Sequence, residues 1–139
     1  QEMFENGDSQ QVINYFSTNL FTPHLKARTR EEVLMQMCAK ITHYHLAPND
    51  FFEAVMKREN MGQTDFGNMV AIPHPYKVIS EESFVSVAIL DKPIIWNKNE
   101  VQVVFLLSVG LKEDSALENF YQKIVDIVFD AKAIQSLIH

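Results

Sequence analysis

The stretch that most limits the possible folds is residues 101–109, VQVVFLLSV. It is apolar almost without interruption, whereas a strand with one face in water would alternate apolar and polar side chains. A nearly continuous apolar run of this length is typical of a central strand that is buried on both faces. Such a strand needs a covering layer on each side of its sheet, so the run predicts a layered fold.

Helical patterns stand on both sides of the strand-forming middle of the chain. Thr29-Arg-Glu-Glu32 is a capping box, in which the Thr hydroxyl and the Glu carboxylate satisfy backbone N–H groups where a helix begins. Apolar residues then follow at three- and four-residue intervals, and His45 is the last on that face. Further helical segments are expected at residues 9–17, 50–60, 114–130 and 131–138.

The extended segments lie mainly between these helices. They are residues 19–25, 69–73, 83–90, 92–96 and 101–109, of which 92–96 is either a short strand or a turn. Helices, strands and helices again predict an α/β fold, with a mixed sheet of about five strands flanked by helices on both faces. We expect one domain at residues 11–139. The polar residues 1–10 are expected to be a linker or a remnant of a longer polypeptide.

Charge and hydropathy exclude two classes of partner. The formal net charge is −6, whereas binding to nucleic acid needs clustered Lys and Arg. No apolar run approaches the roughly 20 residues that a membrane-spanning helix requires. We therefore expect a cytoplasmic protein that contacts neither nucleic acid nor membrane. Cys38 is the only cysteine, so no internal disulfide can form, and we expect it in the core.

His74 stands between two prolines at the end of the expected strand 69–73. Pro75 disfavours helical backbone angles for the residue before it, and Pro73 has a fixed φ and no N–H to donate. The two prolines should hold the backbone stiff and fix the direction of the imidazole. A rigid backbone suits a side chain that must meet a partner protein repeatedly in one geometry. The alternative is that His74 simply ends a strand and points to solvent.

The segment around His74 resembles a known signature. Residues 57–75, KREN-MGQTDFGN-MVAIPHP, are similar to the phosphorylation site of type-2 enzyme IIA domains of the bacterial phosphotransferase system (PTS), the fructose and mannitol class. That signature has an Arg-Glu pair, a loop with Thr and Gly, and an apolar strand that ends in Ile-Pro-His. Arg58 precedes His74 by sixteen positions, as in the family. The resemblance implies the mannitol/fructose IIA fold.

The resemblance assigns a role to each matching residue. It makes His74 the phosphorylated histidine and Arg58 the cation beside its phosphoryl group, with Thr64, Gly67 and Asn68 as further hydrogen-bonding groups. The chemistry agrees, because a neutral imidazole is a competent nucleophile and an arginine fork suits phosphate oxygens. The implied partners are the histidine phosphocarrier HPr as donor and an enzyme IIB as acceptor. The domain would be a phosphoryl acceptor or carrier rather than a turnover enzyme.

Two departures favour one version of this family. Transport-type members have Gly where Pro75 stands, and they carry a second histidine near the start of the helix after the central strand. Here that region reads DSALENF, with Leu117, Glu118 or Phe120 near the expected place and no histidine. Both features resemble the IIA-like domain at the C-terminus of BglG-type transcriptional regulators, so the rest of a longer regulator becomes a further partner. A transporter-linked phosphocarrier and a degenerate binding module that has lost the chemistry remain alternatives.

Other candidate sites are weaker. His43 and His45 lie on different faces of a helix and have no obvious third ligand, so we expect no metal site. No phosphate-binding loop or nucleophile elbow is present, and no cofactor is expected. Trp96 is interpreted as an anchor at the edge of the sheet.

Overall fold

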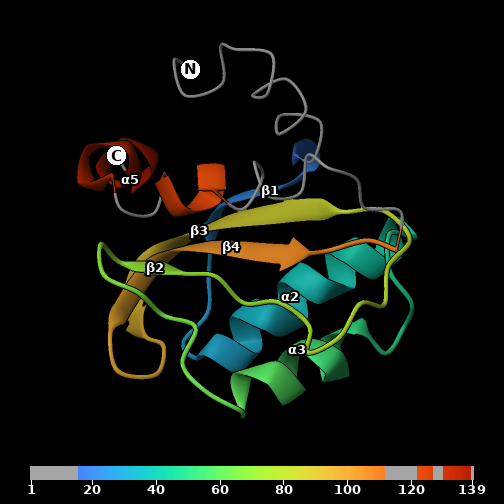
Figure 1. Ribbon diagram of the computed structural model, residues 1–139. Helices are drawn as coiled ribbons and strands as arrows, with labels where there is room; N and C mark the ends of the chain where they lie inside the picture. The colour runs from blue at the N-terminus through green and yellow to red at the C-terminus, as the bar shows by residue number, and fades with distance from the viewer. Residues whose placement is uncertain (1–15, 112–121, 127–129, 139) are drawn as a thin grey trace.

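The computed structural model describes residues 16–111, 122–126 and 130–138. Its elements are β1 (Phe16–Leu25), α2 (Arg30–His43), α3 (Phe51–Glu59), β2 (Val70–Ala71), β3 (Phe84–Ile95), β4 (Glu100–Ser108) and α5 (Ala131–Ile138), shown in Figure 1. Residues 122–126 are also helical. The predicted α/β fold is confirmed.

The strands form one mixed sheet in the order β1-β3-β4-β2. β1 runs parallel to β3, β2 runs parallel to β4, and the central pair β3 and β4 is antiparallel. About five strands were expected, and the described residues form four. The difference arises at residues 92–95, which continue β3 across a register shift between Ile89 and Ile94 instead of starting a strand of their own.

Helices cover both faces of this sheet, as the apolar run at residues 101–109 predicts. Figure 1 shows α2 and α3 on one face and α5 with the helical residues 122–126 on the other. Consecutive residues of β4 therefore enter different cores. The core beneath α2 and α3 includes Leu34, Ile41, Phe51, Val55 and Leu106. The core on the other face includes Val70, Val87, Phe105, Ile124 and Ile134.

The capping box sets the start of α2. The Thr29 hydroxyl accepts from the Glu32 N–H at 3.1 Å, and the Glu32 carboxylate accepts from the N–H of Arg28 at 2.8 Å. α2 buries Cys38, where burial and then the charge of Glu53 raise the pKa of the thiol to about 12. The prediction that Cys38 belongs to the core is confirmed.

Three expectations about individual residues are wrong. Phe16 does not end a helix but begins β1, where it pairs with Val85 of β3, and residues 9–15 lie outside the described part of the chain. His45 is exposed beyond the end of α2, with a positive φ of 58°, so it does not share the helix's apolar face. Trp96 is only 3% exposed and lies in the core beneath α2 and α3. Its indole N–H donates to the buried Glu59 and Thr64.

The candidate phosphoryl-accepting site

His74 lies just past β2, at the edge of the sheet where two parallel strands end. The carbonyl of Pro73 accepts from the N–H of Leu107 at 3.0 Å, so pairing with β4 extends beyond the two residues of β2. Because β2 and β4 run in the same direction, their carboxyl ends lie at the same edge. The segment Ile72-Pro73-His74 is thus fixed beside the end of the central strand.

A hydrogen bond orients the half-buried imidazole of His74. Its Nδ1 atom lies 3.1 Å from the carbonyl oxygen of Ile72. A carbonyl oxygen can only accept, so in this arrangement Nδ1 carries the proton. Nε2 of the neutral ring then holds the free lone pair.

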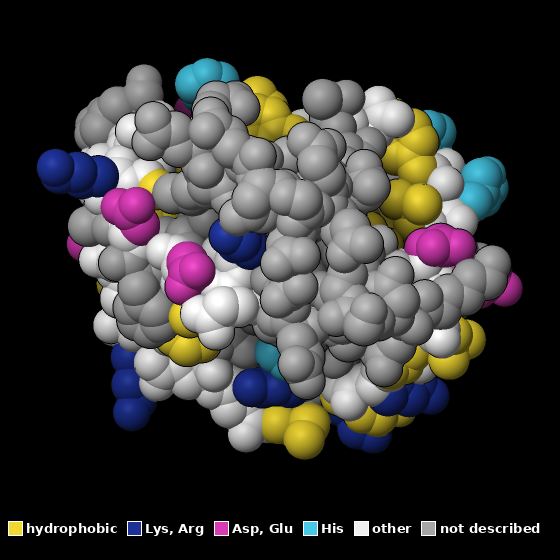
Figure 2. Space-filling view, turned by 45° about the horizontal axis from the view of Figure 1, so that its top comes forward, with side chains coloured by type: hydrophobic (Ala, Val, Ile, Leu, Met, Phe, Trp, Pro, Cys, Tyr) yellow, Lys and Arg dark blue, Asp and Glu magenta, His cyan; other side chains and the backbone are white. Residues whose placement is uncertain are grey.

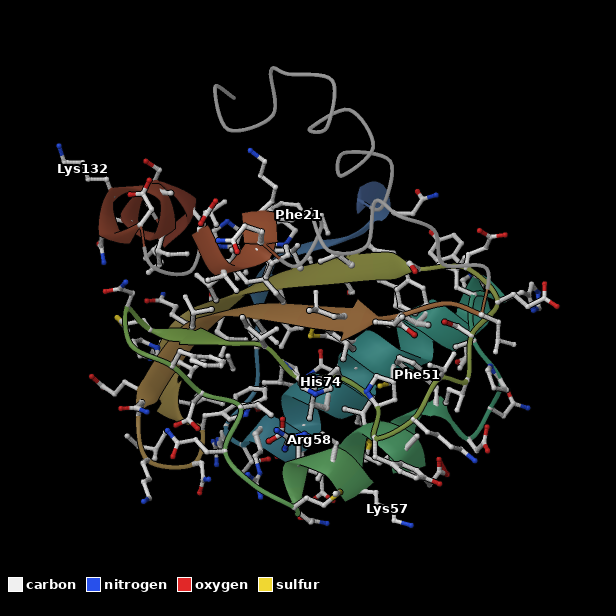
Figure 3. All side chains as sticks on the ribbon, viewed as in Figure 1. Phe21, Phe51, Lys57, Arg58, His74 and Lys132 are labelled. Atoms are coloured by element: carbon white, nitrogen blue, oxygen red, sulfur yellow. The ribbon has the colours of Figure 1, made fainter. Side chains whose placement is uncertain are left out.

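The ring of His74 lines a pocket of about 200 Å³ in which most of the lining side chains are apolar. The pocket is lined by Arg58, Gln63, Thr64, Phe66, Ile72, His74, Leu107, Ile124 and Val125. Arg58 comes from α3, His74 from the end of β2, and Ile124 from the helical segment on the opposite face of the sheet. Figure 3 shows Arg58 and His74 on these neighbouring elements.

Arg58 stands in the last turn of α3, where a cation is favoured by the helix dipole. One guanidinium nitrogen, Nη1, donates to the carbonyl of Gly62 at 3.1 Å. A guanidinium has five N–H donors, so further donors remain for an anion in the pocket. The structure thus brings Arg58 and His74 to one pocket, although sixteen positions separate them in the sequence.

The three residues predicted as further hydrogen-bonding groups, Thr64, Gly67 and Asn68, lie in different surroundings. Thr64 lines the pocket and is buried, but its hydroxyl donates to Glu59, so donation to a phosphoryl group would require that bond to break. Gly67 and Asn68 are exposed in the loop before β2 and are not among the lining residues of the pocket. Glu118 lies outside the described residues.

A buried polar cluster next to the pocket was not predicted. Glu59 is 2% exposed, and its carboxylate accepts from Trp96 Nε1 at 3.2 Å and pairs with Arg30 Nη1 at 3.4 Å. Thr64 completes the cluster. Its members come from α2, α3, the following loop and the end of β3, so no local sequence pattern indicates it.

The turn after His74 is attached to α3. The N–H of Tyr76 donates to the carbonyl of Ala54 at 3.1 Å, and the ammonium of Lys57 lies 4.4 Å from the centre of the Tyr76 ring. Cations over aromatic rings contribute modestly at exposed positions. α3 thereby holds the chain just after His74.

Cations and apolar side chains share the surface near this site. Phe66 and Tyr76 are 41% and 39% exposed, and Lys57 and Lys77 lie beside Tyr76. On the face shown in Figure 2, most of the visible Lys and Arg side chains lie along the lower edge with hydrophobic ones among them, while the visible Asp and Glu side chains lie higher.

Metal binding and membrane insertion find no support in the described residues. No three His, Cys, Asp or Glu side chains gather there in a way that could hold a metal ion. His43 makes an edge contact with the ring of Tyr44 instead, with centroids 5.1 Å apart. No helix in this part of the chain has the length and apolar character needed to cross a membrane.

Comparison with known families decides the identity of the fold. Residues 14–139 match the family described as "Phosphoenolpyruvate-dependent sugar phosphotransferase system, EIIA 2". The chain belongs to this family. The resemblance inferred from residues 57–75 is therefore confirmed, and it extends over nearly the whole EIIA domain.

Relatives of this EIIA domain include an operon regulator and a phosphotransferase enzyme IIA component. The probable licABCH operon regulator of Bacillus subtilis is 31% identical over 137 residues, which cover 99% of this chain and 21% of the regulator. The chain thus spans about a fifth of that relative's length. The mannitol-specific phosphotransferase enzyme IIA component of Halalkalibacterium halodurans is 29% identical over 91 residues, 63% of each chain.

A solved structure supports the same fold. A chain in the Escherichia coli complex of enzyme IIAMTL with phosphorylated enzyme IIBMTL superimposes with a TM-score of 0.76. The match covers 89% of this chain and 90% of that one at 16% sequence identity.

Proposed function

We propose that this EIIA domain accepts a phosphoryl group on Nε2 of His74 from HPr and serves as a regulatory domain of a longer polypeptide. In the transfer, the P–N bond on the donor histidine of HPr breaks and a P–N bond to Nε2 of His74 forms. The donor ring keeps the electron pair of the broken bond. The proton of His74 stays on Nδ1, where it is hydrogen-bonded to the carbonyl of Ile72, so the accepting ring needs no base.

The observation that carries this proposal is the orientation of His74. Its Nδ1 is held 3.1 Å from the Ile72 carbonyl, which leaves Nε2 as the nucleophilic nitrogen. The ring lines the same pocket as Arg58, whose guanidinium suits the oxygens of a phosphoryl group. In a pocket lined mainly by apolar side chains, such a charge interaction is stronger than in water.

Docking of HPr would use the surface around the pocket. Phe66 and Tyr76 expose apolar area there, as does Val125, which is 40% exposed. Met69, which precedes β2, is half-buried. Phosphocarrier docking is brief, and a small interface suffices for a transient encounter.

Two observations favour the regulatory role over transport. The domain aligns over 99% of its length with the operon regulator. Its sequence also lacks a histidine in DSALENF, and transport-type members carry their second histidine in that region. Glu118 would instead place a carboxylate near a dianionic phosphoryl group and weaken the phosphorylated state.

The second candidate, a transport component that passes phosphate to enzyme IIB, is favoured by the likeness to the mannitol IIA component.

One experiment separates these roles. The domain is incubated with labelled phosphoenolpyruvate, enzyme I and HPr, and a mannitol-class enzyme IIB is then added to the phosphorylated domain. We expect labelling that requires HPr, followed by slow or absent transfer to IIB. Rapid and near-complete transfer would support the transport role. No labelling at all would support a degenerate binding module and refute the proposal. The gene context adds a second test, because a regulator carries nucleic-acid-binding and regulatory domains ahead of this one.

A further inference from the structure

Glu59 is a buried carboxylate that phosphoryl transfer itself does not use. It is the last residue of α3, where the negative end of the helix dipole disfavours an anion, and it is 2% exposed. Burial of a charge is costly unless partners compensate it. Here Arg30, Trp96 and Thr64 all bond to the carboxylate. A carboxylate whose burial is unfavourable in free energy therefore lies directly beside the site.

A series of hydrogen bonds leads from Glu59 to His74. The Thr64 hydroxyl donates to Glu59, and it accepts from Trp96 Nε1 at 3.2 Å. The carbonyl of Thr64 accepts from the N–H of Ile72 at 2.9 Å. The carbonyl of Ile72 in turn holds Nδ1 of His74 at 3.1 Å. The series thus connects the carboxylate of Glu59, through Thr64 and Ile72, to the imidazole of His74.

A second connection leads from Glu59 to Arg58. The bond between Glu59 and Thr64 closes the loop of residues 60–63. Within that loop the carbonyl of Gly62 accepts from Nη1 of Arg58 at 3.1 Å. The guanidinium of Arg58 is thus bonded to the loop of residues 60–63, and the bond between Glu59 and Thr64 joins the two ends of that loop. The same carboxylate therefore supports both residues proposed to act on the phosphoryl group.

We propose that Glu59 is a positioning residue, which acts through Thr64 and Trp96 to hold Arg58 and His74 in the mutual geometry that phosphorylation requires. This inference rests on the proposed function. It also gives Thr64 a role different from direct phosphate binding, because its one hydroxyl hydrogen is used by Glu59.

The test uses three substitutions with matched controls. Glu59→Gln keeps the shape but removes the charge, Trp96→Phe removes the indole N–H, and Thr64→Val removes the hydroxyl. Thr64→Ser restores the hydroxyl and should rescue the effect of Thr64→Val. Glu53→Gln controls for loss of a carboxylate, because Glu53 is exposed on the same helix. Circular dichroism shows for each variant the folded fraction, to which its rate is normalised.

Two readouts are compared. The first is the rate of phosphorylation by HPr, which we expect to fall about 10-fold to 100-fold in Glu59→Gln and Thr64→Val, since small misplacements of reacting groups have effects of this size. The second is the ¹⁵N chemical shifts of the His74 ring at about pH 8.5, where an ordinary imidazole is neutral. We expect the Nδ1-protonated form in the wild type and a mixture of tautomers in these two variants.

The outcomes separate positioning from mere stability and from the proposed function. A rate that falls only in proportion to the folded fraction, with unchanged ring shifts, would overturn the inference. So would failure of Thr64→Ser to rescue Thr64→Val, or an effect of Glu53→Gln as large as that of Glu59→Gln. If the wild type accepts no phosphoryl group, the proposed function fails. The ring shifts then still decide whether Glu59 orients His74.

Discussion

The Nδ1 atom of His74 lies 3.1 Å from the carbonyl oxygen of Ile72, two residues earlier in the chain. The prolines on either side of His74 restrict the backbone angles of this segment, which favours the conformation that this contact requires. The bond selects one tautomer of the neutral ring and leaves Nε2 unprotonated. A short backbone motif thereby both aims the side chain and decides which nitrogen can accept a phosphoryl group.

Substitution of Arg58 should slow phosphorylation without unfolding the domain. Arg58 is partly exposed and donates a hydrogen bond to the nearby Gly62 carbonyl, so little packing depends on it. We expect Arg58→Ala to lower the rate of phosphorylation by HPr about 100-fold. Loss of one hydrogen-bond donor that stabilises the negative charge of a transition state typically has an effect of this size. Arg58→Lys should lower it about 10-fold, because the charge stays but the fork is lost.

Lys57→Ala is the matched control, since it removes a neighbouring cation that is not among the lining residues of the pocket. Rates are measured with labelled phosphoenolpyruvate, and unfolding by urea checks that each variant is folded. A wild-type rate for Arg58→Ala would mean that this residue only stabilises the end of α3.

The sequence was sufficient for features that depend on local patterns. The capping box at Thr29, the helix at Phe51–Glu59 and the buried strand at Glu100–Ser108 each follow from periodicity or from a short motif. His74 and Arg58 were also found from the sequence, because the family spacing connects them. Their common pocket is a consequence of the short loop between α3 and β2.

Features that depend on tertiary pairing were not predictable in this way. Phe16 was expected in a helix, but parallel pairing with β3 draws it into a strand. Trp96 was expected at the edge of the sheet, yet Glu59, 37 positions away, provides a buried acceptor for its N–H. Nothing in the sequence near Phe16 indicates its pairing with β3, and nothing near Trp96 indicates its bond to Glu59.

Gly110 should tolerate no larger side chain. A Cβ atom there would lie 2.4 Å from the carbonyl carbon of Glu82 and 2.5 Å from the carbonyl oxygen of Glu81, both backbone atoms. We expect Gly110→Ala to lower the free energy of unfolding by about 2 kcal/mol, as overpacking commonly does. Gly67→Ala is the control, because nothing lies within 4 Å of its Cβ position. Equal urea midpoints for the two variants would contradict the close packing at Gly110.

Asp65 should make stability depend on acid pH. Burial alone would raise the pKa of Asp65, but hydrogen bonds, chiefly from the N–H groups of Lys98 and Asn99, outweigh it and hold this pKa below 3.8. The unfolded chain therefore binds the proton more readily, and the stability that Asp65 contributes is present above its unfolded pKa. It should be lost as the pH falls through the folded value.

The corresponding measurement is the free energy of urea unfolding between about pH 6 and pH 2. At about pH 6, Asp65→Asn should have a lower free energy of unfolding than the wild type. This difference in free energy should shrink as the pH falls toward about 2. Asp50→Asn, at an exposed position, should show no such convergence. A difference for Asp65→Asn that stays constant with pH would mean that its charge has no part in holding the 98–99 turn.

The most direct test of the central claim is to identify the phosphorylated atom. The domain is phosphorylated with phosphoenolpyruvate, enzyme I and HPr, and the product is analysed by peptide mapping and by ³¹P and ¹⁵N NMR. We predict one acid-labile, base-stable phosphoryl group on Nε2 of His74 and none on His74→Ala. Label on His43 or His45, label on Nδ1 of His74, or label that survives His74→Ala would contradict the account.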